Sequence, residues 1–131
     1  MGVHAYTEAD LAALVRMHAR QGFDYAFPNL ADPLFVSKLV VEDAAGRAVM
    51  ASLARLTCEI YLLSEPWAGK PRERYARLVE LHRAAEQDLL ARGLEDAHAW
   101  LPPAIARRFG RRLEAFGWVR DDAWTPYSRR L

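Results

Sequence analysis

The sequence predicts an α+β fold, a mixed and twisted sheet of six or seven strands with helices on both faces. Residues 51–63 alternate apolar and polar side chains with period two, which is typical of a half-buried strand. Residues 72–92 carry apolar side chains at helical spacing, and the following Gly93 favours a helix C-terminus. Strand and helix patterns then alternate to the end of the chain, which favours a sheet covered by helices.

Length and composition predict one domain, residues 1–131. Apolar residues make up 52% and charged residues 27% of the chain, as in ordinary globular proteins. The net charge of +1 gives no strong field, so nucleic acid is not an expected partner. No apolar run reaches the roughly 18 residues of a membrane span, and the N-terminus lacks a signal-peptide pattern. We therefore expect a cytoplasmic protein that does not enter a membrane.

The N-terminal part predicts a strand, a helix and an irregular segment. Residues 3–6 form the strand, and Thr7 with Asp10 makes a capping-box pattern that starts the helix. His18 lies on the apolar stripe of that helix, where it is either a packed or half-exposed residue or a ligand or base. Residues 23–35 are rich in proline and aromatic residues. They form either a segment held to the core by its aromatics or a lid that binds an acceptor.

The middle of the chain predicts an antiparallel hairpin. Its strands are residues 36–41 and 48–63, and turn-forming residues 42–47 join them. Cys58, the only cysteine, lies on the predicted core face, so it is expected to be an inert apolar residue and not a nucleophile. The opposite face of the second strand carries Arg55, Thr57, Glu59 and Tyr61.

The C-terminal half predicts a right-handed βαβ unit in which residues 94–101 lie parallel to residues 51–63. A helix at residues 104–116 and a pair of short strands within residues 118–131 follow. Four arginines on that helix form either a solvated face or a contact for phosphate or RNA; they are Arg107, Arg108, Arg111 and Arg112. The residues expected in the core are Leu56, Ile60, Leu78, Val79, Leu89, Ile105, Phe109 and Leu113.

This layout resembles the GNAT (Gcn5-related N-acetyltransferase) superfamily along nearly the whole chain. The similar features are the opening strand and helix, the hairpin, the central strand before a long helix, and the helix end at residues 113–118, Leu-Glu-Ala-Phe-Gly-Trp. The resemblance implies the acyl-CoA N-acyltransferase fold and transfer of an acetyl group from acetyl-CoA to an amine. Degenerate proteins of this kind are similar to some uncharacterised bacterial and phage members.

The resemblance also implies where acetyl-CoA would bind. The family cradles the pyrophosphate in a Gln/Arg-x-x-Gly-x-Gly/Ala loop before the long helix. Here that loop keeps one glycine, Pro71 removes one N–H donor, and Glu73 opposes the phosphate charge. Acetyl-CoA is therefore expected to bind weakly. The residues that would contact it are Leu62, Leu63, Gly69, Lys70, Arg72 and Arg74.

The same resemblance places Glu59 where many members of the family carry a carboxylate general base. The alternative is a structural carboxylate paired with Arg55 or another arginine. The family's tyrosine general acid falls at Leu113, which cannot donate a proton. Two functions stay open, a metal-free N-acetyltransferase and a catalytically inactive binding or structural module. The expected partners are an amine acceptor, either a small molecule or a protein, and a second copy of the chain.

Overall fold

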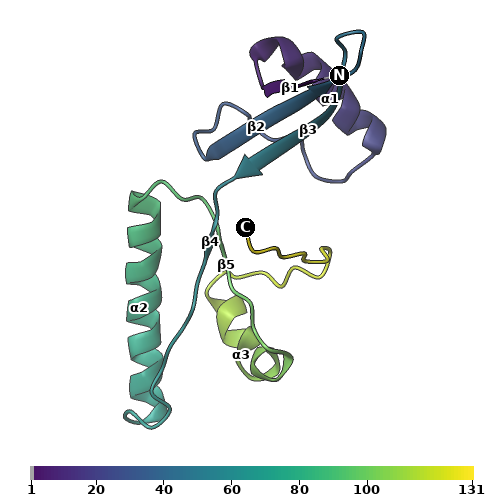
Figure 1. Ribbon diagram of the computed structural model, residues 1–131. Coiled ribbons are helices and arrows are strands. Elements are labelled where there is room, and N and C mark those ends of the chain that lie inside the picture. The colour runs from purple at the N-terminus through teal and green to yellow at the C-terminus, as the bar shows by residue number, and fades with distance from the viewer. Residues whose placement is uncertain (1) are drawn as a thin grey trace. The chain divides into compact units, whose positions relative to one another are not determined.

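The structure is a computed structural model that describes residues 2–131. It divides into two compact units, of which the first ends at His98 and the second is Ala99–Leu131. The elements of the first unit (Figure 1) are β1 (Gly2–Ala5), the short 3-10 helix η1 (Glu8–Asp10), α1 (Leu11–Gln21), β2 (Phe35–Glu42), β3 (Ala48–Arg55), β4 (Cys58–Glu59), α2 (Pro71–Ala91) and β5 (Ala97–His98). The second unit contains α3 (Pro103–Ala115).

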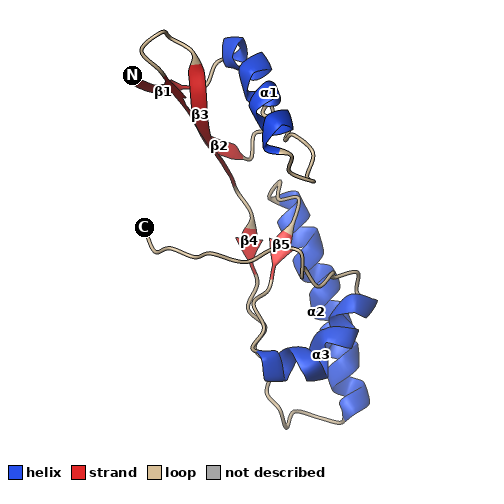
Figure 2. Ribbon diagram, turned by 90° about the vertical axis from the view of Figure 1, so that its right-hand side faces the viewer, coloured by secondary structure: helices blue, strands red, loops and turns tan. Residues whose placement is uncertain are grey.

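Strands β1, β2 and β3 form an antiparallel sheet in that order. One face of this sheet packs against α1 (Figure 2). The core of the described residues consists of Leu14 from α1, Leu30 from the segment before β2, and Val40 from the central strand. Val40 is fully buried and lies opposite His4 on one neighbouring strand and Ala51 on the other. The core is therefore centred on the middle of the central strand.

The β2–β3 turn is held by one aspartate. Asp43 accepts the backbone N–H of Ala45 and of Arg47 at 2.9 Å each, and Arg47 Nε also donates to it at 2.9 Å. Gly46 has a φ of 76°, a conformation that costs glycine little. The hydrogen bonds from Arg47 lower the pKa of Asp43, the backbone N–H contributing most. The predicted hairpin is confirmed for β2 and β3.

The two C-terminal helices confirm the helical periodicity of the sequence. Helix α2 begins with Pro71, and the backbone N–H of Lys70 donates to Glu73 Oε2 at 3.1 Å. Proline suits this position because the first helical N–H has no partner within the helix. Gly93 follows the end of α2 with a φ of 82°, and Gly117 follows α3 with a φ of 90°.

Strands β4 and β5 form a separate parallel pair. Cys58 lies opposite Ala97, and Glu59 lies opposite His98. The backbone N–H of Ile60 extends the pairing by donating to the His98 carbonyl at 2.8 Å. The predicted parallel pairing of these two segments is confirmed, but each strand has only two residues.

The predicted fold class is wrong. The described residues contain a three-stranded antiparallel sheet and a two-stranded parallel sheet, not one sheet of six or seven strands. The apolar run at residues 51–63 divides after Arg55, because β3 takes its hydrogen bonds from β2 whereas β4 takes its bonds from β5. No strand is present among residues 118–131, where the chain is almost entirely exposed.

The predicted core is wrong as well. All eight residues expected there are exposed or half-buried. Seven of them belong to α2, α3 or the segment after β4, and none of the buried core residues comes from these parts of the described chain. Among the described residues, no helix is both long and apolar enough to span a bilayer.

Candidate functional site

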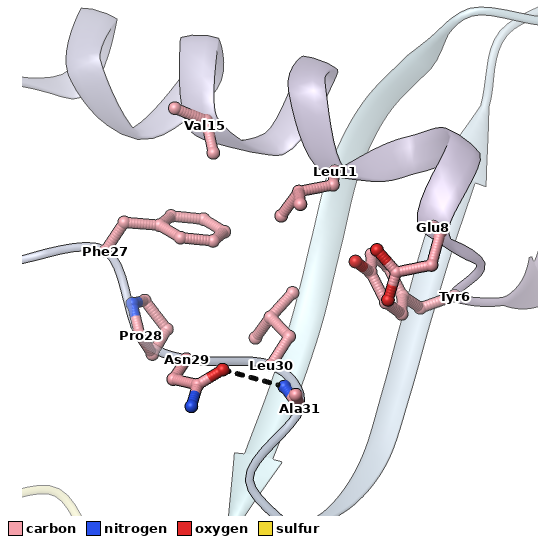
Figure 3. Close-up of a pocket in the computed structure, with 9 residues that line it drawn as sticks. All are labelled: Tyr6, Glu8, Leu11, Val15, Phe27, Pro28, Asn29, Leu30 and Ala31. Atoms are coloured by element: carbon pink, nitrogen blue, oxygen red, sulfur yellow. Dashed lines mark hydrogen bonds between the residues drawn. The ribbon is translucent and has the colours of Figure 1, made fainter.

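A half-open hollow of about 320 Å³ lies beside the core, between α1 and the segment that leads to β2 (Figure 3). Leu11 and Val15 line it from α1. They are four residues apart and therefore share one face of the helix. Phe27 and Leu30 line it from the opposite segment, and Tyr6 and Glu8 lie at one end. The hollow thus has mainly apolar walls and one carboxylate.

The segment that forms the second wall is held in place by several hydrogen bonds. Asn29 Oδ1 accepts the N–H of Ala31 at 3.1 Å, and the Asn29 carbonyl accepts the N–H of Asp32 at 3.1 Å. Lys38 Nζ donates to the Leu30 carbonyl at 2.9 Å. Because Leu30 is also a core residue, this wall is attached both to the sheet and to α1.

Aromatic contacts continue this attachment toward the end of α1. The His18 ring lies edge-on to Tyr25 and Phe27, with ring centroids 5.0 and 5.7 Å apart. Phe27 and Phe35 also pack against the core. Of the two alternatives for His18, these contacts favour the packed residue. The predicted attachment of residues 23–35 to the core is confirmed for Phe27 and Phe35, whereas Phe23 and Tyr25 are exposed. The same segment provides a wall of the hollow.

Charged side chains of both signs lie near the Tyr6 end of the hollow. Partial removal from water raises the pKa of the Tyr6 phenol, and the charges of Glu8 and Asp10 raise it further. Lys38 Nζ lies 5.4 Å from the centroid of the Tyr6 ring. The Glu8 carboxylate itself is exposed and can accept hydrogen bonds from a cation that enters from solvent.

The predicted catalytic residue, Glu59, is an exposed residue of β4. Its hydrogen bond with the Tyr61 hydroxyl raises the pKa of that phenol. Arg55 does not provide the expected structural pair, because its guanidinium donates to Glu95 and Asp96 at 2.9 Å each. Glu59 is therefore hydrogen-bonded to a neighbouring phenol and open to solvent.

The predicted cofactor residues fall into two groups. Gly69, Lys70 and Arg74 come together at the start of α2, where Arg74 donates to the Gly69 carbonyl at 2.8 Å. Arg72 is exposed in the first turn of the same helix. The second group is Leu62 and Leu63, which are exposed side chains between β4 and α2.

The start of α2 is occupied by groups of the chain itself. Glu73 accepts the N–H of Lys70, and Arg77 donates to the Ala68 carbonyl at 3.1 Å. A free helix N-terminus binds anions through such N–H groups. Here the Glu73 carboxylate already accepts the hydrogen bond of one such N–H group, that of Lys70.

The residues of the hollow were not among the predicted site residues. In the sequence, Leu11 belongs to the apolar stripe of a predicted helix, and Glu8 belongs to the predicted capping segment before it. Their common location depends on how residues 27–31 fold back over α1, and no short motif encodes that path. The only hint was the proline and aromatic content of residues 23–35.

Comparison with protein-family models gives no match, and neither a curated protein nor a solved structure matches the chain.

Proposed function

We propose that this protein is a binding module for a small amphipathic amine. The ligand places its hydrocarbon part in the hollow and its ammonium group at Glu8. The observation that carries the proposal is the combination of apolar walls from Leu11, Val15 and Phe27 with a single carboxylate at one end (Figure 3). Small-molecule sites combine largely apolar walls with a few polar groups that set the ligand's orientation.

The size of the hollow limits the ligand and its affinity. A volume of about 320 Å³ is at the lower end of the range for small-molecule sites. A ligand of roughly 9 to 12 non-hydrogen atoms, at about 0.3 kcal/mol per atom, binds with a dissociation constant of roughly 2 to 10 mM. An exposed carboxylate adds at most about 1 kcal/mol to that affinity. The expected ligand is therefore a small arylalkylamine or alkylamine, bound weakly.

A titration followed by amide NMR tests the proposal. The ligands are 2-phenylethylamine and the similarly sized neutral alcohol 2-phenylethanol. We expect both to shift the amide signals of residues 6–15 and 27–31, with the amine binding more tightly. Glu8→Gln should remove the preference for the amine and leave binding of the alcohol unchanged. Glu86→Gln, a change of an exposed carboxylate on α2, is the matched control. Absence of shifts at the hollow, or a preference for the amine that survives Glu8→Gln, would contradict the proposal.

The second candidate function is the acetyl-CoA-dependent N-acetyltransferase implied by the resemblance to the GNAT superfamily. The parallel β4–β5 pair favours it, because Glu59 lies on the strand that precedes the α2 loop. In this reaction the acceptor nitrogen attacks the thioester carbon, coenzyme A leaves as its thiol, and Glu59 takes the proton of the ammonium.

Acetyl transfer to the same amines tests this second function. We expect Glu59→Gln to lower the rate by roughly 10² to 10⁴ at neutral pH, with partial recovery at high pH, where the amine is already deprotonated. Asp88→Asn, which changes an exposed carboxylate of α2, is the control. A rate that is unchanged in Glu59→Gln would eliminate this residue as the base. Amine binding without any acetyl transfer would leave the binding module as the function.

A further inference from the structure

Three side chains with metal-binding groups converge near the start of the chain, outside the hollow. They are His4 on β1, Asp10 on η1 and Glu42 at the end of β2. His4 Nε2 lies 3.0 Å from Glu42 Oε1 and 3.9 Å from Asp10 Oδ1, and all three ligand atoms lie within 4.8 Å of one another. The antiparallel register explains the first contact. Since His4 lies opposite Val40, Glu42 is its diagonal neighbour on the same face.

The backbone contact of His4 places a hydrogen on one nitrogen of its imidazole. Nδ1 lies 2.8 Å from the Ala5 carbonyl oxygen, which can only accept a hydrogen bond, so Nδ1 carries a hydrogen. In the neutral ring, Nε2 then presents a lone pair toward two carboxylates. Three acceptors cannot face one another without a positive charge among them, so either a proton or a metal ion occupies this position.

Hydrogen bonds to other atoms orient the imidazole and one carboxylate. A histidine ligand usually donates its second ring N–H to a carbonyl or carboxylate, as His4 does to Ala5. Asp10 Oδ2 accepts the backbone N–H of Thr7 at 2.9 Å and the Thr7 hydroxyl at 3.3 Å. Asp10 Oδ1 takes no part in these two hydrogen bonds and faces His4. Such outer hydrogen bonds are what fixes the ligands of a metal centre.

The spacing of the ligand atoms fits a small divalent ion. Bond lengths of about 2.0–2.1 Å in a tetrahedral site place ligand atoms roughly 3.3 Å apart. The two distances measured from His4 Nε2, 3.0 and 3.9 Å, lie on either side of that value. Two carboxylates and a neutral imidazole carry a charge of −2, which a divalent cation balances. The His4 and Glu42 side chains are 33% and 41% exposed, so water can reach the fourth coordination position.

We propose that His4, Asp10 and Glu42 form a binding site for a divalent transition-metal ion such as Zn²⁺. Nitrogen and carboxylate ligands together favour Zn²⁺ over Mg²⁺ or Ca²⁺, which prefer oxygen ligands alone. The sequence predicted a protein without a metal ion, so this site was not expected. It does not depend on the amine hollow, because Glu8, Leu11 and Phe27 take no part in it.

A proton competes with the metal ion for His4 Nε2. The hydrogen bond to the Ala5 carbonyl raises the pKa of His4, and the charges of Asp10 and Glu42 raise it further, while partial removal from water lowers it. The full chain should therefore be titrated at about pH 8, where metal ligands are more fully deprotonated. The probes are Zn²⁺ followed by calorimetry and Co²⁺ followed by its visible absorption.

We expect one Zn²⁺ per chain and a Co²⁺ absorption band that Zn²⁺ removes. Loss of a group that only hydrogen-bonds to a metal ligand weakens metal binding by roughly 10- to 100-fold. His4→Gln and Asp10→Asn each change a ligand itself, so each should weaken Zn²⁺ binding by more than that. His82→Gln on α2, outside the proposed site, should leave the affinity unchanged. Circular dichroism shows whether each variant folds, and Glu42→Gln replaces any variant that does not. Absence of binding, or equal affinity in His4→Gln and the wild type, would overturn the proposal and assign a proton to Nε2.

Discussion

The burial of Val40 makes the core of the first unit directly testable. Val40 is 0% exposed in the centre of β2, whereas Val36 on the same strand is 59% exposed. Val40→Ala removes two buried methyl groups, which contribute about 1.6 kcal/mol at about 0.8 kcal/mol each. A residual cavity of about 50 Å³ adds about 1.2 kcal/mol at about 24 cal/mol per Å³. We therefore expect the free energy of unfolding to fall by about 2–3 kcal/mol.

Urea denaturation measures this loss. With a slope of about 1–3 kcal/mol per M for a small protein, the unfolding midpoint should fall by roughly 1–2 M. Val36→Ala makes the same chemical change on the same strand and should alter the free energy of unfolding by less than about 0.5 kcal/mol. Equal losses in the two variants would refute the reasoning, because they would show that Val40 is not the centre of the core.

Two further predictions concern local structure. Gly69→Ala and Gly93→Ala both place a side chain at a positive φ, of 78° and 82°. In Gly69→Ala the new Cβ would also move Glu73 Oε2 away from the Lys70 N–H, whereas nothing lies near the new Cβ in Gly93→Ala, so thermal melting should occur lower in Gly69→Ala. Equal melting temperatures would contradict the contact with Glu73. The Asp43 carboxyl has a folded-state pKa below the ordinary value of 3.8, because Arg47 donates hydrogen bonds to its ionised form. Ionised Asp43 therefore stabilises the folded state above pH 3.8, and this stabilisation is lost as the pH falls through the folded-state pKa. Urea midpoints of wild type and Asp43→Asn should therefore differ most near neutral pH and converge in acid; a difference independent of pH would exclude this mechanism.

The helices could be predicted from the sequence because their signals are local. Periodic apolar residues, Pro71 at the first helical position and Gly93 after the last turn are signals that act over a few residues. The β2–β3 hairpin was predictable for the same reason, since the turn that joins its strands is short. The bounds of α2, α3 and β2 agree with the expectation to within one residue, whereas β3 ends at Arg55 and not at residue 63.

The sheet could not be predicted, because strand pairing is not local. Alternation along residues 51–63 indicates an extended backbone but not the neighbour that supplies its hydrogen bonds. The chain divides at Leu56, whose N–H donates to the Leu34 carbonyl at 2.9 Å. Arg55, expected near Glu59, instead reaches Glu95 and Asp96, which are distant in sequence.

The candidate sites show the same limit. The hollow requires residues 27–31 to lie against α1, and the metal site requires β1 to pair with the end of β2. Both depend on contacts between distant segments. The resemblance to a family predicted Glu59 and the α2 loop as site residues, whereas Glu8 and His4 belong to no recognisable motif.

The start of α2 offers a way to separate the two candidate functions. Glu73 holds the Lys70 N–H that a phosphate would need, and its negative charge opposes an anionic cofactor. We therefore expect acetyl-CoA to bind no tighter than the high micromolar range, as measured by calorimetry. Glu73→Gln removes the charge and should strengthen acetyl-CoA binding by several-fold if the cofactor uses this loop. Sub-micromolar binding by the wild type would contradict the inhibitory role of Glu73.

Amine binding should respond differently to the same change. The hollow is lined by residues of α1 and its neighbouring segments, and Glu73 is not among them. Glu73→Gln should therefore leave the affinity for 2-phenylethylamine unchanged, whereas Glu8→Gln should lower it and leave acetyl-CoA binding intact. If both changes alter both ligands, the hollow and the α2 loop act as one site, and the acetyltransferase gains support over the binding module. If only the amine responds to Glu8 and acetyl-CoA responds to neither change, the loop does not serve a cofactor.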